Sequence, residues 1–169
     1  MIRAVRAVMA MMLVVGVTAC GDSKFKTYDG PPITQVQVDK SKRRMYMISG
    51  DKVVKKYKVS LGNQPQGHKQ FEGDGRTPEG VYFIDRTNPN SRYHLSVGIS
   101  YPNAQDVARA AAVGRNAGSD IFIHGRGPEG NSLIQRRKDW TAGCIAVSDD
   151  EIEDIYAMLR PGTPVVINP

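Results

Sequence analysis

Two neighbouring stretches organise this chain, Asp120-Ile-Phe-Ile-His124-Gly125 and Asp139-Trp-Thr-Ala-Gly143-Cys144-Ile-Ala-Val147. Each contains a short apolar run, so each predicts a strand, and the strands carry an imidazole and a thiol at their ends. These two groups are the minimum equipment for nucleophilic catalysis by cysteine, because the thiolate attacks and a nearby imidazole can lower the pKa of the thiol. We therefore take Cys144 and His124 as a candidate catalytic pair.

Two glycines flank this pair. Gly125 follows the histidine, and Gly143 precedes the cysteine. An unsubstituted α-carbon at Gly143 lets a substrate carbonyl approach the backbone, so the N–H groups of Gly143 and Cys144 could receive an oxyanion. The residues alone leave an ordinary alternative open, in which the cysteine is a small core residue and the histidine a turn residue.

Length and charge narrow the class of protein. The chain has 169 residues, enough for one domain with a substantial core. A formal charge of +6 favours an anionic partner. We find no basic run interleaved with aromatic residues in the way that nucleic-acid surfaces usually are, so we expect no nucleic acid and favour a negatively charged wall polymer.

The N-terminus predicts export. Two arginines flank the start of an apolar run at residues 7–17, which is too short to span a bilayer as a permanent helix. Val17-Thr-Ala-Cys20 resembles the lipobox of bacterial lipoproteins, which implies that Cys20 is lipidated and anchors the mature chain to a membrane. Gly21 follows in place of aspartate, and the usual sorting rule then favours the outer membrane, facing the periplasm. Ordinary cleavage or an uncleaved signal anchor are the alternatives.

This interpretation divides the chain into a lipoprotein signal peptide (1–19), a tether (20–32) and one domain (33–169). With Cys20 acylated, Cys144 is the only thiol left in an oxidising compartment, which suggests that chemistry requires it. A disulfide between the two cysteines is the competing explanation.

Within the domain, alternating apolar residues predict strands and 3.6-residue spacing predicts two short helices. Ser148-Asp-Asp-Glu151 is a capping box for the second helix. The expected fold is mostly β and mostly antiparallel, with two peripheral helices. The predicted strands are 33–39, 44–48, 53–61, 80–85, 93–99 and 163–168; the helices are 103–113 and 149–159; the long loops are 62–78 and 126–138.

Several motifs together resemble one family. His124-Gly125 followed by Thr141-Ala-Gly-Cys144 is similar to the hallmark of the L,D-transpeptidase catalytic domain, the YkuD-like family of cell-wall enzymes. Gly73-Asp-Gly-Arg-Thr-Pro-Glu-Gly80 resembles that family's Thr-Pro-x-Gly turn. Three further segments resemble a Gram-negative branch of it: Ser91–Ser96, Ile99–Asn103 and Asp139-Trp140. The resemblance covers about 33–169 and implies a β-sandwich-like fold.

The resemblance also implies a reaction. Cys144 would attack the carbonyl of meso-diaminopimelate in a peptidoglycan tetrapeptide stem, and D-Ala would leave. His124 would act as the base, oriented by the carbonyl of Gly125 in place of a triad acid. An amine would then capture the thioester, with no cofactor. Two alternatives stay open: a hydrolase acting as a carboxypeptidase or amidase, and a non-catalytic wall-binding lipoprotein.

The chain departs from most of the family at Ala146, two residues after the cysteine, where most members carry arginine. The Gram-negative branch that the chain resembles also lacks this arginine, so its loss need not mean inactivity. Arg76 and Arg92 lie in matched motifs and are candidate ligands for the substrate carboxylate, since a guanidinium grips carboxylates bidentately. The alternative for both is a solvated loop charge. The cations of the 126–138 loop (Arg126, Arg136 and Arg137) are interpreted as solvated.

Two more residues are candidate substrate contacts. His94 lies in a matched motif and is expected to line the cleft, while His68 is interpreted as a loop residue. Trp140 could stack on the substrate or pack the loop as a buried indole. The histidines and Cys144 lack a close ligand pair, so we expect no metal site. We expect a monomer.

Overall fold

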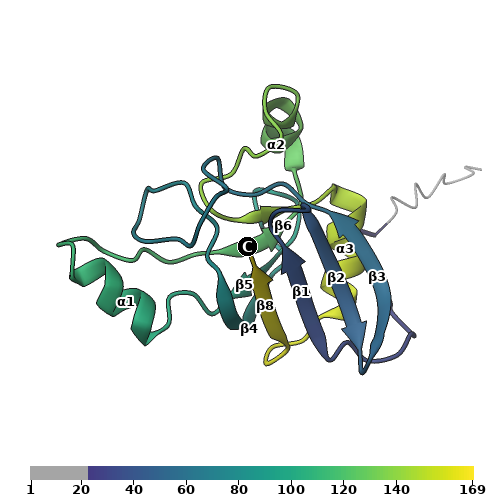
Figure 1. The fold of residues 1–169 in the computed structure, drawn as a ribbon. Helices are drawn as coiled ribbons and strands as arrows, with labels where there is room; N and C mark the ends of the chain where they lie inside the picture. The colour runs from purple at the N-terminus through teal and green to yellow at the C-terminus, as the bar shows by residue number, and fades with distance from the viewer. Residues whose placement is uncertain (1–22) are drawn as a thin grey trace, which may run out of the picture.

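The computed structural model describes residues 23–169 (Figure 1). The predicted signal peptide and Cys20 lie outside the described residues. Eight strands and three short helices make up this part of the chain. In chain order they are β1 (Gln35–Asp39), β2 (Arg44–Ser49), β3 (Lys52–Lys58), β4 (Gly80–Asn88), β5 (Ser96–Ile99), α1 (Ala104–Ala111), β6 (Phe122–His124), α2 (Gly127–Ile134), β7 (Ile145–Ala146), α3 (Asp149–Met158) and β8 (Pro164–Asn168).

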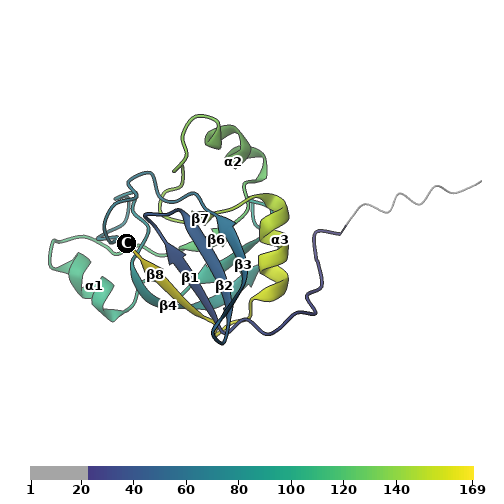
Figure 2. The ribbon, with the colours of Figure 1, turned by 45° about the vertical axis from the view of Figure 1, so that its right-hand side comes forward.

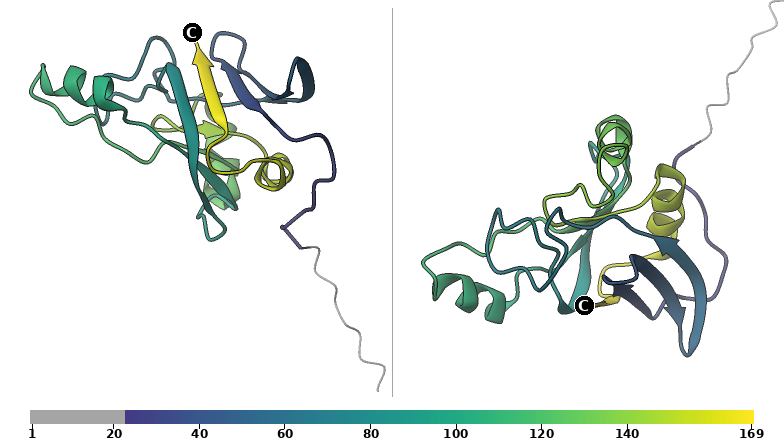
Figure 3. Two further views of the ribbon diagram at one scale, coloured as in Figure 1. Left: turned by 90° about the horizontal axis from the view of Figure 1, so that it is seen from below. Right: turned by 45° about the horizontal axis from the view of Figure 1, so that its top comes forward.

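The strands form one curled sheet in the order β3-β2-β1-β8-β4-β5-β6-β7. Neighbours are antiparallel except for the pairs β1/β8 and β6/β7. The two ends of the sheet approach each other, because the Ser60 N–H donates to the Ala146 carbonyl at 2.8 Å and the Ala146 N–H returns a bond at 2.9 Å. Figure 3 (left) shows β8, in yellow, between β1 and β4. The predicted mostly β, mostly antiparallel fold is confirmed.

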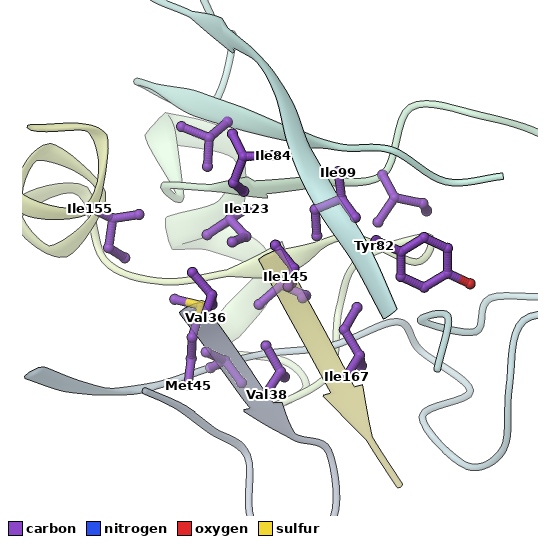
Figure 4. Packing of buried hydrophobic residues seen from close by; sticks show 14 of the residues in the cluster. Val36, Val38, Met45, Tyr82, Ile84, Ile99, Ile123, Ile145, Ile155 and Ile167 are labelled. Carbon is purple, nitrogen blue, oxygen red and sulfur yellow. The ribbon is translucent and has the colours of Figure 1, made fainter. Parts of the chain in front are cut away.

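The inward faces of the curled sheet make the hydrophobic core (Figure 4). Val36 and Val38 of β1 are fully buried, as alternation in a strand facing a core requires. They meet side chains from the opposite end of the sheet, such as Ile123 and Ile145, and Ile155 of α3 closes the side. Burying each such side chain stabilises the fold by about 1.5–3 kcal/mol before entropy is counted.

The two predicted helices are present, and their caps explain their starts. Asn103 accepts the N–H of Asp106 and so begins α1. Ser148 and Glu151 form the predicted capping box of α3. Each helix is slightly shorter than predicted.

A third helix, α2, lies in the stretch predicted as a loop (126–138). Its glycines and a proline at its start conceal it in the sequence, since both residues have low helix propensity. Tertiary packing requires one of the glycines: a Cβ on Gly130 would come within 2.7 Å of the Trp140 ring. The start of β5 also differs from the prediction, because His94 takes a positive φ of 76° and the strand begins only at Ser96.

The predicted tether packs on the domain over its described part. Phe25 packs against Tyr156 of α3, with 6.1 Å between ring centroids. Lys26 pairs with Glu153 at 3.3 Å and with Asp154 at 3.0 Å. Figure 2 shows this segment running beside α3. Within residues 23–169, no helix is long and apolar enough to cross a membrane.

Candidate active site

The structure brings the predicted pair together. His124 is the last residue of β6, and Cys144 directly precedes β7. Parallel pairing sets Ile123 opposite Ile145, so His124 and Cys144, each one residue from this pair, lie on the same face of two neighbouring strands. Both line a cavity of about 390 Å³. Its other walls are Asn88, Ser91, Arg92, Tyr93, Ser96, Asp120 and Phe122.

A backbone carbonyl orients the imidazole. The Nδ1 atom of His124 lies 2.5 Å from the Gly125 carbonyl oxygen. A carbonyl oxygen only accepts hydrogen bonds, so the proton of the neutral ring lies on Nδ1 and Nε2 is left as an acceptor. The Gly125 carbonyl thus holds the imidazole in place of a carboxylate partner.

Two aromatic rings surround the imidazole. Tyr93 stacks on His124 with 4.5 Å between ring centroids, and Trp140 meets it edge-on at 5.6 Å. Burial lowers the pKa of His124 to about 4, and the hydrogen bond to Gly125 only partly opposes this shift. The imidazole is therefore neutral near neutral pH. Trp140 is itself buried, so it packs the histidine and its loop, the second of its two expected roles.

The thiol of Cys144 is also neutral. Cys144 Sγ donates to the Asp120 carbonyl oxygen at 3.5 Å. Burial raises the pKa of the Cys144 thiol, while the backbone at Phe122 and the charge of Lys69 lower it in part. The sulfur therefore rests as a thiol rather than as a thiolate.

The turn before β7 sets the backbone of Cys144. Thr141 Oγ1 donates to the Cys144 carbonyl at 2.7 Å and accepts the Gly143 N–H at 3.2 Å. Gly143 has a φ of 147°, and a Cβ there would lie 2.8 Å from the Arg76 carbonyl oxygen. The glycine is thus required by backbone packing. Since its N–H is bonded to Thr141, the Cys144 N–H is the remaining predicted oxyanion donor.

The chain after His124 is fixed by the first residue of α3. Asp149 Oδ1 accepts the N–H groups of Arg126 and Gly127 at 2.7 and 2.9 Å. A Cβ on Gly125 would lie 2.5 Å from that carboxylate oxygen. Sequence reasoning assigned Asp149 only to helix capping and missed this role. It also missed Tyr93, whose one signal was its place in the matched segment 91–96.

The predicted substrate-binding residues separate into two groups. Arg92 lines the cavity, with 71% of its side chain exposed, and pairs with Glu129 of α2. Arg76 does not line it: its Nη1 donates to the His68 carbonyl oxygen at 3.4 Å. His94 does not line it either, because its Nε2 bonds Glu153 at 2.8 Å. The expectation that His94 lines the cleft is therefore wrong.

The histidines lie apart from one another. His68 bonds Asp106 at 2.9 Å, whereas His94 bonds a residue of α3 and His124 lies in the cavity. In the described range 23–169, no three His, Cys, Asp or Glu side chains are grouped as metal ligands would be.

Comparisons with known proteins agree on one family. Residues 33–167 match the model of the L,D-transpeptidase catalytic domain, YkuD. YafK of Escherichia coli (strain K12) is 29% identical over 133 residues, which are 75% of this chain and 47% of YafK. The crystal structure of the helical cell shape determining protein Pgp2 from Campylobacter jejuni is similar, with a TM-score of 0.60 and 26% identity over 87% of this chain and 51% of that one.

The fold extends to more distant structures. An L,D-transpeptidase from Mycobacterium smegmatis has a TM-score of 0.53 at 16% identity, covering 80% of this chain and 58% of that chain, a likeness of fold alone. The chain spans about half the length of YafK and Pgp2. Because the family model matches most of its length, the chain belongs to the L,D-transpeptidase catalytic domain (YkuD) family.

Proposed function

We propose that this protein is a cysteine-dependent L,D-transpeptidase acting on peptidoglycan tetrapeptide stems. One observation carries the proposal: Cys144 and His124 line the same cavity, and the Gly125 carbonyl fixes the imidazole with Nε2 as its acceptor. Membership of the family supports it. So does the likeness to a protein named for cell shape.

The proposed reaction starts from a neutral thiol on Cys144 and a neutral imidazole on His124. His124 Nε2 takes the thiol proton as Cys144 Sγ attacks the carbonyl carbon of diaminopimelate. The Cys144 N–H stabilises the resulting oxyanion. The C–N bond to D-Ala then breaks, and the imidazolium returns the proton to the leaving amine. The thioester that remains is attacked by an incoming amine, whose proton passes to His124; the C–S bond breaks, and the released thiolate takes that proton to restore the thiol.

Arg92 is the better candidate for the substrate's free carboxylate. Of the two predicted arginines, only Arg92 lines the cavity. Its guanidinium lies over the Tyr93 ring, 5.2 Å from the centroid, so it is held beside the catalytic histidine. A substrate carboxylate would exchange with Glu129, the present partner of Arg92.

Hydrolysis is the second candidate, because Ala146 stands where most family members carry arginine. Without a cation beside Cys144, the site binds the carboxylate of an incoming amino-acid acceptor more weakly. Water would then capture the thioester, giving a carboxypeptidase or an amidase.

Defined muropeptides test the proposal. The purified chain is incubated with tetrapeptide stems, with and without an amine acceptor, and the products are measured by mass spectrometry. We expect D-Ala release with a cross-linked or exchanged product, and a loss of at least about a thousandfold in rate for Cys144→Ala. Product formed by water alone would make the protein a hydrolase. Wild-type rates in Cys144→Ala would exclude the cysteine mechanism. If the native chain forms no product, the remaining candidate is a non-catalytic wall-binding protein.

The proposed substrate agrees with the cellular location that the N-terminal sequence predicts. Peptidoglycan lies outside the cytoplasm, and the lipobox-like Val17–Cys20 would attach the mature chain to a periplasm-facing membrane as a lipoprotein.

A further inference from the structure

The positive charge of this chain is concentrated in one hairpin. Residues 40–58 contain eight lysines and arginines and one aspartate, a net charge of +7, whereas the whole chain carries +6. This stretch includes β2, β3 and the turn that precedes them. The remainder of the chain is thus nearly neutral, and the hairpin is its basic part.

Half of these cations have acidic partners within the domain. The four ion pairs are Lys40–Glu79, Lys42–Asp39, Arg43–Asp139 and Lys55–Asp154. The other four are Arg44, Lys52, Lys56 and Lys58, and in residues 23–169 their side chains make no ion pair. They are therefore the charges left for an external partner.

Strand register gathers three of them on one face. Met45 and Met47 of β2 point into the core, so Arg44 and Tyr46 point outward. Arg44 lies opposite Lys58, and Tyr46 lies opposite Lys56. We call this surface the basic face: Arg44, Tyr46, Lys56 and Lys58. The views in Figures 1 and 2 show no helix over this side of β1–β3, while α3 packs behind it.

The arrangement is costly without a ligand. Like charges directly opposite on neighbouring strands destabilise the pair, and Arg44 and Lys58 are such a pair. Lysines on the edge strand β3 also keep a sheet edge from pairing with other chains. That role does not account for Arg44, which lies on the second strand. An anionic partner would offset the repulsion.

We infer that the basic face docks the anionic glycan–peptide strand of intact peptidoglycan, outside the catalytic cavity. Stem carboxylates would pair with the three cations, and a sugar ring would pack on Tyr46, which is half-buried among them. The face adjoins the catalytic end of the sheet, because Lys58 is two residues before Ser60, whose backbone pairs with Ala146. The inference rests on the proposed function, since that function makes peptidoglycan the polymer to be held.

Binding to purified sacculi tests the inference without requiring catalysis. The full chain carrying Cys144→Ala is pelleted with insoluble peptidoglycan at about 0.05 and 0.3 M salt. A second protein adds Arg44→Gln, Lys56→Gln and Lys58→Gln. The matched control instead adds Arg136→Gln, Arg137→Gln and Lys138→Gln, three exposed cations with the same total charge. Kd and unfolding midpoint are measured for each.

We expect the basic-face variant to bind sacculi roughly tenfold more weakly at low salt, and the control to stay within about twofold. With Cys144 restored, its kcat/KM on soluble muropeptides should be unchanged. Equal losses in variant and control would mean that net charge alone acts, and would overturn the inference. The inference would also be overturned if the basic-face variant kept its binding to sacculi but lost binding to vesicles of anionic phospholipid. The face would then be a membrane contact. The two proposals can fail separately. If sacculus binding depends on the basic face but the chain with native Cys144 has no transpeptidase activity, this inference is upheld and the proposed function is rejected.

Discussion

Burial, rather than a neighbouring acid, sets the protonation state of His124, the proposed base. Its ring lies between Tyr93 and Trp140 and is 3% exposed, so the charged form is disfavoured. Its one described polar contact is the Gly125 carbonyl, which fixes the tautomer but carries no full charge. The proposed base His124 and the proposed nucleophile Cys144 are thus both neutral near neutral pH.

This burial predicts a pH dependence of stability. The pKa of His124 is about 4 in the folded chain, against 6.5 when unfolded. Between these values the unfolded state binds the proton and the folded state does not, so the free energy of unfolding falls as pH drops from about 6.5 to about 4, by about 3 kcal/mol. Urea unfolding at several pH values measures this slope. His124→Gln removes the titrating group, and an unchanged slope in that variant would contradict the assignment.

The two arginines give a second prediction at the scale of the residue. Because Arg92 lines the cavity and Arg76 does not, Arg92→Ala should lower kcat/KM on a tetrapeptide roughly tenfold or more, and Arg92→Lys should restore it only in part. Arg76→Ala should have a smaller effect. The comparison is repeated with the substrate carboxylate amidated. If Arg92→Ala keeps the wild-type preference for the free carboxylate, that carboxylate is bound elsewhere.

Among the elements, the β1–β2 turn supports the catalytic turn through one ion pair. Arg43 Nη2 lies 2.8 Å from Asp139 Oδ2, and Asp139 Oδ1 accepts the Leu61 N–H at 3.1 Å. We expect Asp139→Ala to lower the free energy of unfolding by about 2–3 kcal/mol, because it leaves Arg43 and a backbone N–H without an acceptor. Glu129→Ala is the matched control. Its pair with Arg92 is exposed, so its loss should cost at most about 1 kcal/mol. Equal costs would contradict this account.

Among the strands and helices, local sequence patterns predicted those elements whose formation depends on neighbouring residues. Alternation located β1 and β2, and a capping box located α3. Helix α2 was missed because its stability depends on packing around Gly130, which propensity does not register. His94 was misplaced for a related reason: its motif resembled a cleft segment, but its side chain turns toward Glu153 of α3.

For the whole molecule, closure of the sheet unites parts of the chain that sequence alone leaves apart. The bridge from Ser60 to Ala146 joins the segment that follows β3 to β7, which begins directly after Cys144. Such register depends on long-range pairing, so motifs could name Cys144 and His124 as partners but could not reveal the basic face. That face alternates with buried residues along two strands and becomes a surface only once they are paired.

The N-terminal segment supplies the last prediction, which concerns where the domain is held. Lys24 Nζ bonds the Pro89 carbonyl oxygen at 2.6 Å, so the docked segment reaches the β4–β5 loop beside the cavity. Lys24 is four residues after Cys20. Four residues of extended chain span at most about 14 Å, so a lipid on Cys20 would hold the cavity's rim close to the membrane.

We expect the wild-type chain to incorporate a clickable fatty acid and to partition into detergent, and Cys20→Ala to do neither. Cys144→Ala is the control, since it removes the other thiol and should keep the label. An unlabelled wild type, processed to a single soluble form, would mean ordinary signal cleavage. The packing of Phe25 and Lys26 on α3 would then serve only to order the domain's N-terminus.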